Sequence, residues 1–214
     1  MTRDDKDTIR QSIHGLLSDT DPDKLILKSL RSIMPSKRRK LFITAALFLS
    51  VVIYLFYFSR AYTNAIERTM NLIETVNTIS LPVLGLAVTG YAIFQALANG
   101  DTLITMLKVN ENEKSKFQEY NYFFLAFSIL YIFIIIINFL TIVFLRNVSL
   151  DWHISFFSLT VNNVIYSLVM SIYFTFILNA FVEIKCFVYN LYQIFSTNAS
   201  AKGITYLNSN ESEK

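Results

Sequence analysis

The sequence predicts an all-α integral membrane protein with four transmembrane helices. Four stretches of 19, 26, 26 and 31 residues contain no Asp, Glu, Lys or Arg: 41–59, 75–100, 120–145 and 152–182. A helix of about 20 apolar residues crosses a hydrocarbon core of about 30 Å. Hydrophobic residues make up 53% of the chain and charged residues only 16%, against about 25% charged residues in soluble domains. These stretches use most of the apolar residues, so we place four spans at about 41–59, 78–98, 121–145 and 158–182.

The basic residues beside the spans predict the orientation of the chain. One side of the membrane would hold nine of them: Arg31, Lys37, Arg38, Arg39, Lys40, Lys108, Lys114, Lys116 and Lys185. The opposite side would hold only Arg60, Arg68 and Arg146. Because cytoplasmic loops are enriched in Lys and Arg, both termini are expected in the cytoplasm, and the protein is expected in the inner (plasma) membrane.

The cluster Lys37, Arg38, Arg39 and Lys40 holds most of the net charge of +3 and directly precedes the first span. This position favours contact with lipid headgroups over nucleic-acid binding, which we do not expect. The lipid bilayer is therefore the first expected partner.

Residues 1–36 are expected to form a cytosolic amphipathic segment of two short helices. The second helix has Asp21 as its cap, Pro22 in its first turn and Pro35 at its end. Its apolar face comprises Ile26, Leu27, Leu30, Ile33 and Met34. This face could lie in the membrane interface or pack on the cytosolic surface of the same chain. The segment lacks the apolar core of a cleavable signal peptide, so the first span is expected to act as an uncleaved signal anchor.

Residues 37–183 are expected to form the transmembrane domain. Pro82, Gly85 and Gly90 mark the second span as a candidate hinge. Proline removes a backbone hydrogen bond, and glycine lets helices approach closely. The span could therefore be a gating or pore-lining element or a central packing helix. Residues 101–202 contain neither Gly nor Pro, which predicts straight third and fourth spans.

The fourth helix is expected to continue into the cytosol over residues 184–197. Ile184, Phe187, Leu191 and Ile194 alternate three and four residues apart, which is typical of a helix seam. This candidate seam could contact a second chain, the same subunit or the membrane surface. Residues 198–214 are polar and are expected to be disordered.

The fourth span carries a polar residue at every fourth position: Asn163, Ser167, Ser171, Thr175, Asn179 and Glu183. Gln95 and Asn99 of the second span could belong to the same lining. Polar side chains within a membrane face protein or water. The polar row could make interhelical hydrogen bonds, worth about 0.6 kcal/mol each, or could line a water-filled path in an oligomer.

The sequence argues against an enzyme. No acidic or basic residue lies deep inside a span, and no phosphate-binding glycine loop is present. One cysteine and two histidines do not supply a zinc site. We therefore predict no catalytic residue, no metal and no cofactor.

In residues 91–108, YAIFQALANGDTLITMLK, a span of small residues runs into a short amphipathic helix that ends in lysine. With the chain length and four spans, this segment resembles the four-span membrane subunits of bacterial anti-phage systems, in particular the Kiwa type. The resemblance implies an inner-membrane homo-oligomer, a cytosolic effector partner and a response to infection at the envelope. It supplies no catalytic residue.

These observations lead to three functional hypotheses. The first is a homo-oligomeric sensor or effector subunit of an anti-phage system that responds to envelope perturbation, or alters membrane permeability, together with a cytosolic protein. The second is a channel for ions or small solutes that acts alone. The third is a passive membrane anchor for a soluble enzyme.

Overall fold

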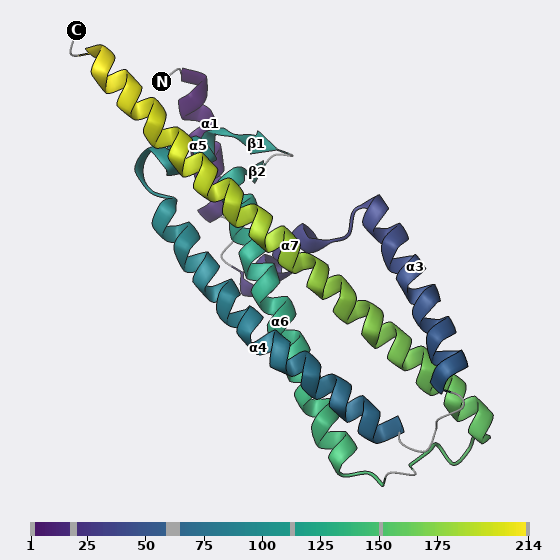
Figure 1. Ribbon diagram of the computed structural model, residues 1–214. Helices are drawn as coiled ribbons and strands as arrows, with labels where there is room; N and C mark the ends of the chain where they lie inside the picture. Colours follow the sequence, from purple (N-terminus) through teal and green to yellow (C-terminus); the bar gives the residue numbers. More distant parts are fainter. Residues whose placement is uncertain (1–2, 18–20, 59–64, 112–113, 150–151, 213–214) are drawn as a thin grey trace. The chain divides into compact units, whose positions relative to one another are not determined.

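The computed structural model describes residues 3–17, 21–58, 65–111, 114–149 and 152–212, and these residues are almost entirely helical (Figure 1). Arg60 lies outside the described residues. The N-terminal helices are α1 (Arg3–Leu17), α2 (Pro22–Leu30) and a short 3-10 helix, η1 (Arg31–Ile33). The long helices are α3 (Lys37–Ile53) with a π-helical turn, η2 (Tyr54–Phe58), then α4 (Ala65–Leu97), α6 (Lys116–Arg146) and α7 (Leu159–Ser212). Between α4 and α6 lie α5 (Gly100–Lys108) and the two short strands β1 (Asn110–Glu111) and β2 (Lys114–Ser115).

Four helices in the described part of the chain are long and apolar enough to cross a membrane: α3 with its π-helical turn, α4, α6 and α7. This confirms the prediction of a helical protein with four membrane-capable segments. Two helices extend well beyond the predicted spans: α4 begins at Ala65 instead of residue 78, and α7 continues to Ser212 past residue 182. Pro82 lies inside α4, and no break in the helix is recorded there.

The start of α2 follows the expected capping pattern. The Asp21 carboxylate accepts hydrogen bonds from the backbone N–H groups of Asp23 at 3.1 Å and Lys24 at 3.5 Å. Pro22 occupies the first turn, where its missing N–H costs no helical hydrogen bond. Ser36 caps α3 in the same way through the N–H of Arg39.

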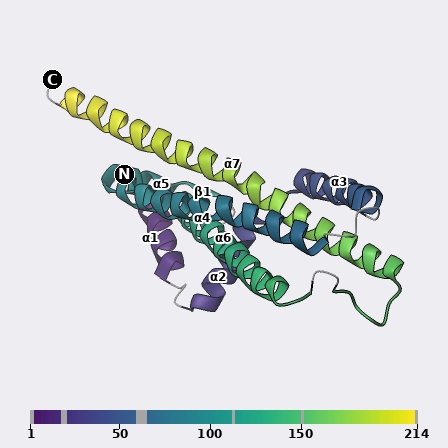
Figure 2. The same ribbon diagram turned by 60° about the horizontal axis from the view of Figure 1, so that its bottom comes forward.

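Helix α7 runs without interruption for 54 residues, about 80 Å at 1.5 Å per residue (Figure 2). The prediction of a disordered tail from Asn198 is wrong as far as Ser212, where α7 ends. Thr102 donates a hydrogen bond to the Asn198 side chain at 3.4 Å. Thr205 donates one to the Asp101 carboxylate at 2.7 Å. The polar residues of this segment therefore have partners on α5, which the sequence pattern does not reveal.

The chain forms two compact units, and α4, α6 and α7 contribute to both. The first unit comprises Met1–Met34, Gly85–Ile129 and Ile184–Lys214; the second comprises Pro35–Leu84 and Leu130–Glu183.

In the first unit, α1 packs on α5 and on β2. The Ser12 hydroxyl donates to the backbone carbonyl of Leu107 at 3.0 Å, and Lys108 pairs with Asp5 at 3.2 Å. Ile9 of α1 is buried in this unit, whereas Ile13 and Leu17 of α1 and Leu27 and Met34 of the following segment are exposed.

The core of the first unit is a cluster of aromatic rings from α4, α6 and α7. Phe187 of α7 stacks on Phe127, with ring centroids 5.0 Å apart, and meets the edge of Phe124 at 5.7 Å. Phe94 of α4 stacks on Phe124 at 5.6 Å. Gly90 leaves room for this cluster, because an added Cβ would lie 2.5 Å from Phe187 Cζ.

Candidate functional site

The polar row of α7 belongs to the second unit, where its side chains meet α3. Ser167, Ser171, Thr175 and Glu183 are buried, and Asn163 and Asn179 are partly buried. Ser50 of α3 lies 3.3 Å from the Thr175 hydroxyl and donates to the Ser171 carbonyl at 3.4 Å. Thr175 of the row therefore makes an interhelical hydrogen bond, whereas the Ser171 hydroxyl donates to the Ser167 carbonyl of the same helix at 2.7 Å.

A second set of contacts joins the other end of α3 to α7. Arg39 donates from Nε to the Asn179 side-chain oxygen at 2.9 Å and from Nη2 to the Asn179 carbonyl at 2.9 Å. Its Nη1 forms an ion pair with the Glu183 carboxylate. The Arg39 and Glu183 side chains are only 15% and 3% exposed. Burial strengthens this charge-assisted pair but also makes each charge costly without the other.

The spacing along the two helices explains this arrangement. Arg39 and Ser50 are 11 residues apart, close to three turns, so they lie on one face of α3. Their partners Glu183 and Thr175 are 8 residues apart on α7 and run in the opposite direction. Helices α3 and α7 therefore lie antiparallel and are joined by polar contacts at two levels.

Three further polar residues form a chain across the second unit. The Tyr173 hydroxyl donates to the Asn138 side chain of α6 at 3.0 Å, and Asn138 donates to Asn77 of α4 at 2.9 Å. Asn77 and Asn138 were not among the residues predicted from the sequence, although Asn138 interrupts an otherwise apolar run of α6. Near the other end of the unit, the hydroxyls of Thr69 and Tyr166 lie 2.9 Å apart.

Two buried oxygens of the second unit have no hydrogen-bond partner among the residues that the structure describes. They are the Asn163 side-chain carbonyl and the Ser80 hydroxyl. Gln95 and Asn99, which were expected beside the polar row, belong to the first unit and bond there. Gln95 donates to Asn121 at 3.0 Å, and Asn99 donates to the Ala96 carbonyl at 2.9 Å.

The candidate seam of α7 contacts its own chain. Phe187 and Ile194 are buried within the first unit, and Ile184 and Leu191 are half-buried. Among the candidate hinge residues, Gly90 makes the close approach to Phe187, whereas an added Cβ at Gly85 would meet nothing within 4 Å.

The basic cluster before the first span divides into two groups. Lys37, Arg38 and Lys40 are exposed in the first turn of α3. Arg39 instead points to α7. The headgroup-facing role expected for the cluster remains a prediction for the three exposed residues, while the structure gives Arg39 partners within the chain.

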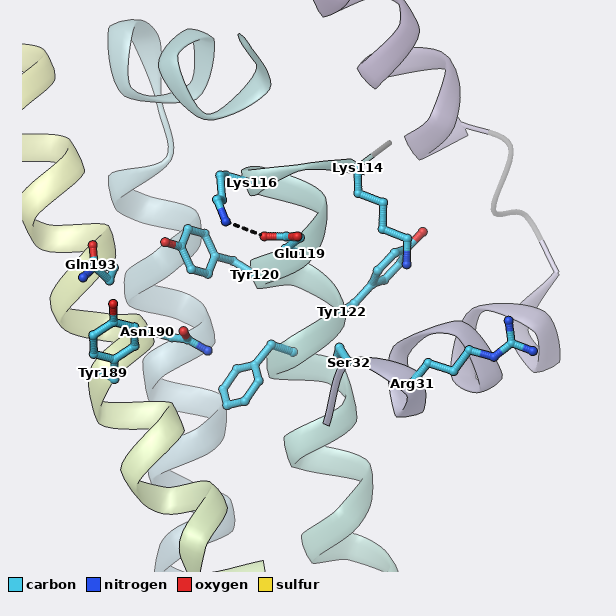
Figure 3. A pocket seen from close by; sticks show the side chains of 11 residues that line it. Arg31, Ser32, Lys114, Lys116, Glu119, Tyr120, Tyr122, Tyr189, Asn190 and Gln193 are labelled. Atoms are coloured by element: carbon cyan, nitrogen blue, oxygen red, sulfur yellow. Dashed lines mark hydrogen bonds and ion pairs between the residues drawn. The ribbon is translucent and has the colours of Figure 1, made fainter. Parts of the chain in front are cut away.

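A cavity of about 570 Å³ opens in the first unit (Figure 3). Its walls come from η1, β2, the first two turns of α6 and the part of α7 after residue 183. The lining residues are Phe123 and those labelled in the figure: Arg31, Ser32, Lys114, Lys116, Glu119, Tyr120, Tyr122, Tyr189, Asn190 and Gln193. Lys116 pairs with Glu119 at 2.9 Å, and the Lys114 ammonium lies 4.9 Å from the centre of the Tyr122 ring. The sequence analysis used these lysines only to assign the orientation of the chain.

A second cavity, of about 440 Å³, lies in the second unit between α4, α6, α7 and the segment before α7. Its walls are mainly apolar and include Trp152, His153 and the Thr69–Tyr166 pair. Within the described ranges, no three His, Cys, Asp or Glu side chains gather as a metal site would require.

Two candidate sites follow from the described residues: the polar contacts of α7, and the cavity of the first unit lined by Arg31, Lys114 and Lys116, here called the basic cavity. The first holds helices together, and the second has the charge and volume to accept a ligand. Comparison of the chain with protein-family models, with curated proteins and with solved structures finds no match.

Proposed function

We propose that this chain is a multi-pass protein of the bacterial inner membrane, with both termini in the cytoplasm. We further propose that it acts as a non-catalytic sensor or effector subunit together with a cytosolic protein. The observation that carries the proposal is the set of polar contacts by which α7 binds α3 and α6 in the second unit.

These contacts support membrane insertion. A side chain that can hydrogen-bond is costly against lipid unless it finds a partner. On α3, Arg39 and Ser50 bond to α7, while Phe42, Phe48 and Leu49 are exposed. Exposed phenylalanine and leucine beside buried serine and arginine are the reverse of a soluble surface and suit a helix that faces lipid.

The same contacts favour a sensor over a channel formed by one chain. The side chains of Thr175, Asn179 and Glu183 bond to α3, and the Ser171 hydroxyl donates to the Ser167 carbonyl of its own helix. These side chains therefore do not line an open path within one subunit. Neutral polar contacts such as Ser50–Thr175 contribute only about 0.6 kcal/mol each, so the end of α3 near Ser50 is held less firmly than the end with the buried Arg39–Glu183 pair. A change in the surrounding membrane could therefore shift the helices against one another.

The first unit is the proposed docking region for a soluble partner. Val188, Tyr192, Phe195 and Tyr206 are exposed on α7, at spacings that keep them on one side of the helix. They lie beyond the predicted membrane limit near residue 182. The resemblance of residues 91–108 to Kiwa-type membrane subunits suggests anti-phage defence as the process to test.

The test is native mass spectrometry of the protein extracted from its own cells in mild detergent. A homo-oligomer that carries a second, soluble protein is the expected result. A homo-oligomer without a second protein would favour the stand-alone channel, and a monomer would contradict both oligomeric functions. Alanine at Ser167, Ser171 and Asn179 should weaken assembly; unchanged assembly and activity would exclude the polar row from the mechanism.

A further inference from the structure

The basic cavity of the first unit has a positive lining. Its charged side chains are Arg31, Lys114, Lys116 and Glu119, three basic residues and one acidic residue. Glu119 pairs with Lys116 at 2.9 Å and so fixes the position of that ammonium group in the wall. Lys114 is placed by the Tyr122 ring, 4.9 Å away. Arg31 lies at the rim, with its guanidinium directed outward (Figure 3). The lining therefore favours an anion.

Neutral donors complete the wall opposite η1. Tyr189, Asn190 and Gln193 reach the cavity from successive turns of α7, and Tyr120 reaches it from α6 (Figure 3). Hydroxyl and amide groups can donate hydrogen bonds to phosphate oxygens or to the hydroxyls of an attached polar group. The cavity volume of about 570 Å³ falls within the range of about 300–1,000 Å³ found for small-ligand sites.

The position of these residues along the helices matches the headgroup layer. Lys116 precedes the predicted start of the third span at residue 121 by five residues, about 8 Å of helix. Tyr189 follows the predicted end of the fourth span at residue 182 by seven residues, about 10 Å. By the positive-inside rule, both points lie on the cytoplasmic side.

We infer that this cavity binds the phosphate group of an anionic phospholipid headgroup from the cytoplasmic leaflet. Lys114 and Lys116 contact the phosphate, and Arg31, whose guanidinium is directed outward, adds positive charge at the rim. Tyr189, Asn190 and Gln193 hydrogen-bond to the remainder of the headgroup. Basic pockets between transmembrane helices on the cytoplasmic side are suited to such headgroups. The inference rests on the proposed membrane insertion.

The test uses the full chain, purified and delipidated in a non-ionic detergent. Short-chain phosphatidylglycerol is titrated, and bound lipid is measured by native mass spectrometry against phosphatidylcholine of the same chain length. We expect phosphatidylglycerol to bind at least tenfold more tightly. Equal affinities for the two lipids would overturn the inference.

The variant is Lys114→Gln with Lys116→Gln. Each basic residue near an anionic lipid contributes roughly fivefold in affinity, so the double change should weaken phosphatidylglycerol binding about 25-fold. The matched control, Lys185→Gln with Lys202→Gln, removes the same charge from exposed positions of the same unit outside the cavity. The control should change affinity less than twofold; an equal loss in both would show a general effect of charge and overturn the site.

A second variant, Gln193→Glu, keeps the size of the side chain and places a carboxylate in the wall of the cavity. It should lower phosphatidylglycerol binding with the phosphatidylcholine affinity unchanged, so the inference stays testable if the double lysine variant fails to fold. Wild-type binding of phosphatidylglycerol after this change would contradict the site.

A further arm distinguishes the source of the phosphate. Soluble glycerol phosphate should compete only weakly with the lipid; full competition at equal concentration would overturn the lipid assignment in favour of a soluble phosphate compound. A protein that needs no detergent for solubility would overturn membrane insertion itself. A detergent-dependent protein without lipid preference would overturn only the cavity inference.

Discussion

Arg39 illustrates how one residue can leave the role that its neighbours suggest. It belongs to a run of four basic residues, yet its guanidinium turns away from them to Asn179 and Glu183. The pair joins residues 144 positions apart in the chain. A guanidinium presents several donors in a fixed plane, so it can bond to an amide and a carboxylate together, which lysine cannot do in the same way.

Replacement of Arg39 by Ala should destabilise the protein by about 3 kcal/mol, because Glu183 would remain buried without its partner. Thermal unfolding in detergent measures this effect. Arg38→Ala, at an exposed position one residue away, is the control and should be close to neutral. Adding Glu183→Gln to Arg39→Ala should recover part of the loss; no recovery would mean that the charge pair is not the cause.

Two glycines of α4 provide a matched pair of substitutions. In Gly90→Ala the new Cβ would lie 2.5 and 2.7 Å from two atoms of the Phe187 ring. That ring is stacked on Phe127 and cannot move freely, so overpacking should cost about 1–3 kcal/mol. In Gly85→Ala the Cβ meets nothing within 4 Å, and the higher helix propensity of alanine should stabilise the helix by up to about 1 kcal/mol. Melting temperatures that move in the same direction for both variants would contradict this packing.

At the scale of elements, the length of α7 depends on contacts with α5 as much as on the sequence of α7 itself. The segment after Asn198 is polar, yet it continues the helix because α5 supplies partners. Asp101 lies in the first turn of α5 and accepts a hydrogen bond from Thr205, 104 residues further along the chain. A helix whose own residues favour solvent can thus be held in place by a few side-chain contacts.

Asp101→Ala should loosen the end of α7, because Thr205 loses the partner that binds it to α5. A charged hydrogen bond of this kind contributes about 1 kcal/mol or more, so trypsin cleavage at Lys202 should become about fivefold faster. Limited proteolysis followed by mass spectrometry measures the rate. Thr197→Ala serves as the control, since that hydroxyl donates to the Gln193 carbonyl of its own helix. An equally faster cleavage in this variant would mean that the contact with α5 is not the cause.

The elements differ in how far sequence alone predicts them. Charge-free stretches predict the four long helices, and Asp21 with Pro22 predicts the start of α2, because both signals are local. The Asn179–Arg39 contact and the pairing of Asn138 with Asn77 could not be predicted, because nothing in a single sequence states which helix faces which. The basic cavity was missed for the same reason: its lining comes from η1, β2, α6 and α7.

At the scale of the whole molecule, the distribution of charge remains the argument for orientation. Phe156 lies in the segment between α6 and α7 and is 96% exposed, whereas Lys202 is exposed near the end of α7. The proposed topology places these two positions on opposite sides of the membrane. The chain has one cysteine, Cys186, so a background without cysteine needs a single substitution.

In a Cys186→Ala background, Phe156→Cys should react with a membrane-impermeant maleimide in cells whose outer membrane alone is permeabilised. Lys202→Cys should react only after the inner membrane is opened, because the positive-inside rule places it in the cytoplasm. Gel-shift labelling measures both. The reverse pattern would invert the proposed topology, and labelling of both positions in intact cells would contradict an even number of spans.

The long separation of Arg39 and Glu183 also has a consequence for biosynthesis. A ribosome adds about 5–20 residues per second, so the 144 residues between the two positions take roughly 7 to 30 s to synthesise. During that interval the first span has left the ribosome while its charge partner does not yet exist. Until translation reaches α7, Arg39 has no partner on that helix, and in the proposed topology only the neighbouring Lys37, Arg38 and Lys40 favour this end of α3 at the membrane surface. Completion of the ion pair thus marks a nascent chain whose last long helix has reached its first.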